Sequence, residues 1–115
     1  MTIRENSIQK DIGILGLMVL KITKYFDKYV YIGDLIYDLE NYLSQLTTVN
    51  KQWKQHFRTL WLDVEVAYSL ALDQGLEILT DEGNVIADNS LNILKKMAED
   101  KKNELEAARK TTGCQ

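Results

Sequence analysis

The chain has 115 residues, of which 45% are hydrophobic and 27% charged, with a formal net charge of −3 and a pI near 5.1. This length predicts a single domain, and the composition is that of an ordinary globular protein, which excludes wholesale disorder. The chain has no proline and six glycines, and no alternating β-branched run is bounded by turn residues on both sides. We therefore expect an all-α fold.

The first predicted helix starts at Ser7 and is apolar nearly all round. Its main face recurs at spacings of three and four: Ile8, Ile12, Leu15, Val19, Ile22 and Phe26. Ile14, Leu17 and Leu20 lie on other sides, which predicts a helix buried between neighbours. Gly13 and Gly16 are candidates for a close helix crossing. The apolar run 12–20 is far shorter than the ~20 residues that span a bilayer, and no small-residue cleavage site follows it.

A second helix is expected between a link at 29–33 and a point near Leu46, with Asp34 as its N-cap or first-turn acid. The predicted core side contains Leu35, Ile36, Leu39, Tyr42, Leu43 and Leu46. The predicted outward side contains Asp34, Tyr37, Asp38 and Asn41. A tyrosine among acids on an exposed face is typical of a protein interface. The alternative is that Tyr37 lies over a neighbouring loop with its hydroxyl in water.

The stretch 53–75 is the predicted centre of the fold and contains the third helix. Asn50 is the expected N-cap of this helix, and Gly75 is the expected residue just past its end. One arc of about 140° holds Trp53, Phe57, Leu60, Trp61, Val64, Ala67, Tyr68, Ala71 and Leu72. Leu62, Val66 and Leu70 form a second apolar line, with Asp63 and Asp73 beside it. Either another helix of the domain covers this line, or the line is a docking stripe for another protein.

The segment 76–87 contains the turn signal Asp81-Glu82-Gly83-Asn84 and is expected to form a small hairpin or a loop. Asp88, Asn89 or Ser90 then caps a fourth helix that continues to about Arg109. Its predicted core side is Leu91, Leu94, Met97 and Ala98. Residues 1–110 form the domain and 111–115 a flexible tail. The predicted architecture is an antiparallel four-helix bundle in which the third helix packs against the first and second.

The positive charges are unevenly distributed along the chain. The segments 29–50 and 59–94 contain no Lys or Arg, and together they hold ten acids: Asp34, Asp38, Glu40, Asp63, Glu65, Asp73, Glu77, Asp81, Glu82 and Asp88. Such a field repels nucleic acid and anionic membranes and attracts basic partners. The alternative is a solvated surface kept soluble by like charge. We expect no nucleic-acid or membrane partner.

Signals for enzymatic chemistry are weak. His56 is the only histidine and lies at the edge of the core arc, so one chain cannot build a multi-histidine metal site. Ser69 has no histidine at a suggestive spacing. The acid pairs Asp34–Asp38 and Asp81–Glu82 lack a ligand loop. Cys114 is the single cysteine and favours a reducing compartment. We therefore predict no catalytic residues, no metal, no cofactor and a cytoplasmic location.

One set of residues resembles a known family. The run Asp34-Leu35-Ile36-Tyr37-Asp38-Leu39-Glu40 is followed by Trp53, Phe57-Arg58, Trp61, Glu65, Tyr68 and Ala71-Leu72. This pattern, over roughly residues 33–95, resembles small helical immunity proteins of bacterial contact-dependent growth inhibition and related polymorphic toxin systems. The resemblance implies a cytoplasmic, non-enzymatic protein that binds and blocks one cognate toxin domain, commonly a nuclease with a basic surface. It transfers no catalytic motif and no contact residues.

The sequence therefore leads to two functional hypotheses. The first is an immunity protein, monomeric or weakly dimeric, that neutralises a basic toxin domain through acidic helical surfaces. Its expected partner-binding residues are Asp34, Tyr37, Asp38, Asn41, Asp63, Glu65 and Asp73, with Tyr37 as an apolar anchor. The second is a homo-oligomeric adaptor or structural protein without a toxin partner, associating through the line formed by Leu62, Val66 and Leu70.

Overall fold

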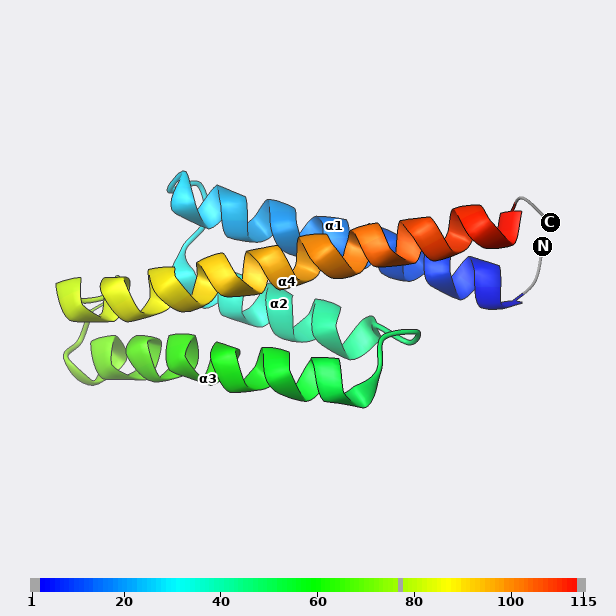
Figure 1. Cartoon of the computed structure of the whole chain (residues 1–115). Coiled ribbons are helices and arrows are strands. Elements are labelled where there is room, and N and C mark those ends of the chain that lie inside the picture. Colours follow the sequence, from blue (N-terminus) through cyan, green and yellow to red (C-terminus); the bar gives the residue numbers. More distant parts are fainter. Residues whose placement is uncertain (1–2, 77, 114–115) are drawn as a thin grey trace.

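The computed structural model describes the backbone of residues 3–76 and 78–113, and the side chains of residues 6–76 and 78–109. These residues form four helices: α1 (Ile3–Phe26), α2 (Ile32–Gln45), α3 (Lys51–Asp73) and α4 (Asp81–Gly113). Successive helices run in opposite directions, and the described part of the chain contains no strand (Figure 1). The predicted all-α, antiparallel four-helix fold is confirmed.

Helix α4, and not α3, makes the most extensive packing contacts. It packs along both α1 and α3, whereas α2 packs mainly against α1 and only lightly against α3. Within the described residues, no Cα atom of α3 lies within 8 Å of a Cα atom of α1, so these two helices are not direct neighbours. The expectation that the third helix packs against the first and second was therefore wrong for the first. At 33 residues, α4 is about 50 Å long and can contact both neighbours along much of their lengths.

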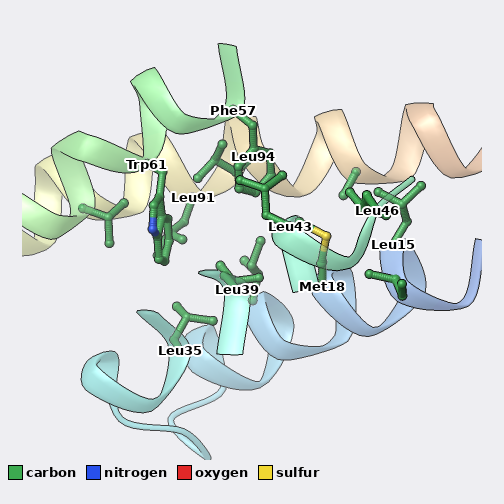
Figure 2. Packing of buried hydrophobic residues seen from close by; sticks show 14 of the residues in the cluster. Leu15, Met18, Leu35, Leu39, Leu43, Leu46, Phe57, Trp61, Leu91 and Leu94 are labelled. Carbon is green, nitrogen blue, oxygen red and sulfur yellow. The ribbon is translucent and has the colours of Figure 1, made fainter. Parts of the chain in front are cut away.

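The core is built from all four helices, as Figure 2 shows for the residues it labels. Its largest fully buried side chains are Trp61, Phe57, Leu15, Met18, Ile22, Leu35, Leu39, Leu43, Leu46, Leu91, Leu94 and Val64. All of these positions except Met18, which was not predicted as a core residue, lie on the faces predicted from helical periodicity. One residue of the predicted core faces is exposed. Leu72, placed in the core arc of α3, is 51% exposed because it lies near the end of the helix.

The ends of α3 are set by the two residues predicted to set them. Asn50 Oδ1 accepts the backbone N–H of Trp53 at 2.7 Å, which satisfies one of the free donors of the first turn. Past the other end, Gly75 adopts φ +73°. The N–H of Gly75 reaches the carbonyl of Leu72, and that of Leu76 reaches Ala71, both at 2.9 Å. This pair of bonds is a Schellman motif, which favours glycine at the left-handed position.

Helix α4 begins at Asp81, well before the predicted cap at 88–90. Thr80 Oγ1 accepts the backbone N–H of Gly83 at 3.0 Å, so Thr80 caps the helix. The residues Asp81-Glu82-Gly83-Asn84 therefore form its first turn, where acids stabilise the positive end of the helix dipole. The α3–α4 connection is a loop and not a hairpin. The helix also continues beyond Arg109 to Gly113, and residues 114–115 of the predicted tail lie outside the described residues.

The two glycines of α1 do not mark a close helix crossing. A Cβ atom added to Gly13 would meet nothing within 4 Å. One added to Gly16 would lie 3.7 Å from the Lys102 side chain of α4, an ordinary contact. The tight approaches lie elsewhere: at Gly33, beside the Tyr68 hydroxyl, and at Gly83, beside Thr80 and Ala67.

Candidate partner-binding surface

The structure places the predicted contact residues of α2 on its outer side. Asp34 and Asn41 are exposed, and Tyr37 is 69% exposed. Asp38 is half-buried, and its carboxylate lies 2.9 Å from the ammonium of Lys21 on α1. The hydrogen bond to Asp38 raises the pKa of Lys21. Asp38 therefore forms a salt bridge within the fold. Asp34 is the exposed acid of this surface that remains available to a partner.

The three predicted acids of α3 do not form one surface. Asp63 faces α4, where its Oδ2 accepts the Ser90 hydroxyl at 3.4 Å. Glu65 lies about 200° further round the helix and is half-buried beside Glu40 of α2. Burial, and then the charge of Glu40, raise the pKa of Glu65 above its ordinary value. Asp73, at the end of the helix, is fully on the surface.

The apolar line on α3 is open to solvent. Leu62, Val66 and Leu70 follow one another at intervals of four residues and are 56%, 50% and 53% exposed. Because the spacing matches one turn of the helix, the three side chains form a continuous stripe. The expectation that another helix of the domain covers this line is thus wrong, and the docking alternative stays a prediction.

The neighbouring helix α4 adds two exposed isoleucines to this stripe. The Asp63–Ser90 bond fixes the register of the antiparallel pair. One turn back from Ser90 is Ile86 and one turn forward is Ile93, each 49% exposed. One turn forward from Asp63 is Val66, which is thereby level with Ile86. We call the set Leu62, Val66, Leu70, Ile86 and Ile93 the α3–α4 face.

The α3–α4 face is flanked by acids at its end near the α3–α4 link and by bases at its other end, where Arg58 precedes Leu62 by four residues and Lys96 follows Ile93 by three. Asp73 follows Leu70 by three residues and Glu82 precedes Ile86 by four, and both are exposed. Neither makes a salt bridge within the part of the chain that the structure describes. No Lys or Arg occurs in the sequence between Arg58 and Lys95, so nothing in these helical segments offsets the negative charge.

Sequence reasoning missed the α4 half of this face. Ile86 lies in the segment 76–87, for which a small hairpin or a loop is expected because Asp, Gly and Asn at 81–84 are typical turn residues. The signal that could have found it is the spacing of Ile86 and Ile93, which is seven residues and thus two helical turns. Recognising that spacing requires first placing the helix start at Asp81.

Two other kinds of site were sought in the described residues. No group of three His, Cys, Asp or Glu side chains gathers there as a metal-binding set. Over the same ranges, no helix combines the length and the apolarity that a membrane crossing requires.

The fold and this surface define a class: an antiparallel four-helix bundle with one open apolar and acidic face. Compared with protein-family models, with curated proteins and with solved structures, the chain matches none.

Proposed function

We propose that the protein is an immunity protein, a cytoplasmic and non-enzymatic inhibitor that binds one basic toxin domain through its α3–α4 face. The observation that carries the proposal is the exposed apolar stripe of α3 within a segment that holds acids and no bases. Exposed apolar surface rimmed by charge is typical of protein interfaces. The resemblance of residues 33–95 to helical immunity proteins agrees with this proposal.

The outer side of α2 is a second, separate candidate surface. Among the described residues, no Cα atom of α2 lies within 8 Å of a Cα atom of α4, so the outer side of α2 does not merge with the α3–α4 face. Tyr37 offers a large exposed ring there, with Asp34 as the open acid beside it. The α3–α4 face offers more apolar side chains, and we therefore assign it the main contact and α2 a supporting one.

A functional assay tests this proposal in bacterial cells that produce the toxic domain encoded next to the gene. Co-production of the wild-type protein should restore growth. Leu62→Lys and Leu70→Lys, which place positive charge in the stripe, should weaken binding of the purified domain at least tenfold and reduce protection. Leu17→Lys is the matched control, because Leu17 is a similarly exposed leucine on α1. Equal loss in all three variants, or full protection by the stripe variants, would contradict the assignment.

Self-association is the second candidate function, because the same stripe could pair two copies. If the two copies pair in parallel, Asp73 and Glu82 meet like charges, which costs free energy at an interface. In that arrangement the two candidates respond oppositely to salt. Screening should strengthen a parallel homodimer and weaken a complex with a basic partner. Sedimentation at low and high salt, with and without the partner, separates them.

A further inference from the structure

A pocket of about 510 Å³ lies at the end of the bundle remote from the chain ends. There the α1–α2 link and the α3–α4 link come together beside the first turns of α4 (Figure 1). Its size falls within the ~300–1,000 Å³ usual for sites that bind small groups. It is separate from the α3–α4 face, since the two lie on different sides of α4: Asn84 and Asp88 line the pocket, whereas Ile86 and Ile93 belong to the face.

Aromatic rings form one wall of the pocket. Tyr25 and Phe26, at the end of α1, are half-buried, with ring centroids 6.0 Å apart and ring planes inclined by 55°. Tyr31, which is 70% exposed, stands at the rim. The faces of such rings carry partial negative charge and attract cations, more strongly where water is partly excluded.

Helix α4 contributes hydrogen-bond acceptors to the pocket lining. Asn84 and Asp88 are one turn apart on α4 and so lie on the same side of it. Asn84 donates its side-chain N–H to the carbonyl of Leu79 at 3.5 Å, which leaves its amide oxygen as an acceptor. Asp88 is half-buried, and no Lys, Arg or His among the described residues forms a salt bridge with it. Tyr25 and Asp88 line the same pocket. Burial and then the charge of Asp88 raise the pKa of the Tyr25 phenol.

The rim also contains a strained residue. Lys28 adopts φ +67°, a left-handed conformation that is unfavourable for a residue with a Cβ atom. Lys28 occupies the same position past the end of α1 that Gly75 occupies past the end of α3. The backbone N–H of Lys28 donates to the carbonyl of Tyr25, and that of Tyr29 donates to the carbonyl of Lys24, which is again a Schellman motif. Lys28 is exposed, and its ammonium does not pair with Asp88.

We propose that this pocket binds an organic cation, the guanidinium or ammonium group of an Arg or Lys side chain, between the rings of Tyr25 and Phe26 and the carboxylate of Asp88. A group with several donors can bond both Asp88 and the amide oxygen of Asn84 while its flat or methylene portion contacts the rings. The assignment of that side chain to a basic partner rests on the proposed function. A free small cation with the same group would bind by the same contacts.

A titration followed by NMR tests the site in the whole chain. The probe is Nα-acetyl-arginine amide, and the neutral control is Nα-acetyl-citrulline amide, which has nearly the same shape. The arginine probe should shift the Tyr25 and Phe26 resonances with a dissociation constant in the millimolar range, and citrulline should bind about tenfold more weakly. Equal binding of the two probes, or no saturable shift with arginine, would overturn the proposal.

Three variants locate the charge that matters. Asp88→Asn should weaken binding of the arginine probe at least fivefold, whereas Asp100→Asn, the same change three turns further along α4, should leave it unchanged. Lys28→Gly should tighten binding, because it removes a positive charge from the rim. If Asp88→Asn disturbs the fold, the Lys28→Gly result still decides, because weaker or unchanged binding in that variant contradicts the site.

The source of the cation is decided by measuring the toxin domain in parallel. If Asp88→Asn weakens binding of both the probe and the domain, the pocket receives a side chain of the partner. If only probe binding weakens, the site serves a free cation. If the wild type binds the probe but confers no protection, the proposed function fails and the pocket stands. If protection is intact and no probe binds, the pocket fails and the proposed function stands.

Discussion

The carboxylate of Asp11 accepts two hydrogen bonds from Thr48, one from its backbone N–H and one from its hydroxyl, each at 2.6 Å. It also accepts the backbone N–H of Thr47, at 3.1 Å and 3.2 Å to its two oxygens. Asp11 is fully buried in α1, and the two threonines belong to the link between α2 and α3. One side chain therefore fixes that link to the first helix.

Removing this carboxylate should destabilise the protein markedly. Asp11→Ala leaves the donors of Thr47 and Thr48 without acceptors, which should lower the free energy of unfolding by about 2–3 kcal/mol. Thr48→Val removes only the hydroxyl bond and should cost about 1 kcal/mol. Urea unfolding of the three proteins measures both values. A loss below about 0.5 kcal/mol for Asp11→Ala would show that these bonds do not hold the link.

Replacing Lys28 by glycine should stabilise the protein. The left-handed backbone at this position costs a residue with a Cβ atom about 1 kcal/mol relative to glycine. Lys28→Gly should therefore raise the free energy of unfolding by up to about that amount. Lys24→Gly is the matched control, because Lys24 lies within the last turn of α1 and glycine there should cost about 1 kcal/mol. Thermal unfolding should move the two variants in opposite directions, and a shift of the same sign in both would contradict the prediction.

Trp61 should tolerate phenylalanine far better than alanine. Its ring is fully buried, and among the described residues its Nε1–H finds no acceptor. Trp61→Ala should cost about 3–5 kcal/mol through the cavity that it leaves. Trp61→Phe keeps an aromatic ring and removes the unsatisfied donor, so its cost should be smaller by about 2 kcal/mol or more. Denaturant unfolding measures both, and equal costs would count against this interpretation.

The burial of Glu65, and then its contact with Glu40, should make the contribution of this residue to stability fall with rising pH. Because the folded-state pKa of Glu65 lies above its ordinary value of 4.5, the folded chain retains this proton more strongly than the unfolded chain. The stabilising contribution is complete below pH 4.5 and is lost as the pH rises through the folded-state pKa.

Glu65→Gln removes this titration. The variant should be more stable than the wild type at pH 7, by a few tenths of a kcal/mol for a solvent-screened pair, and indistinguishable from it below pH 4.5. Glu99→Gln, an exposed acid on α4, is the control and should not alter the pH profile in this window. Stability curves from pH 3 to 8 provide the measurement, and a Glu65→Gln profile parallel to that of the wild type would refute the coupling.

Helical periodicity predicted much of this fold because most core positions recur at three and four residues. It placed the buried faces of α1, α2 and α3, and the local chemistry of Asn50 and Gly75 gave the ends of α3. The prediction failed at the start of α4, where the same residue types are common in two different local structures. Asp, Glu and Asn stabilise turns but also the first turn of a helix, so the start of α4 was placed at 88–90.

The candidate sites were only partly predictable because they depend on contacts between distant segments. The exposed line on α3 was visible in the sequence, but its solvent exposure depends on where α4 packs. Asp38 and Lys21 are 17 positions apart, and their pairing follows only from the α1–α2 contact. Asp11 lies three residues after Ile8, on the core face of α1, and a polar residue at such a position was the available sign of a buried bond.

Helix α4 is longer than α3 and extends beyond the N-terminal end of that helix. From the Asp63–Ser90 contact, twelve residues back along α3 reach Lys51 at its start, and twelve forward along α4 reach Lys102. Residues 103–113 therefore extend past α3 and lie beside α1 (Figure 1). There Arg109 donates a hydrogen bond to Gln9 of α1. A helix pair with so few neighbours opens by itself at a small free-energy cost. Backbone amides there should exchange with deuterium long before those around Trp61, which makes this end an independent subglobal unit.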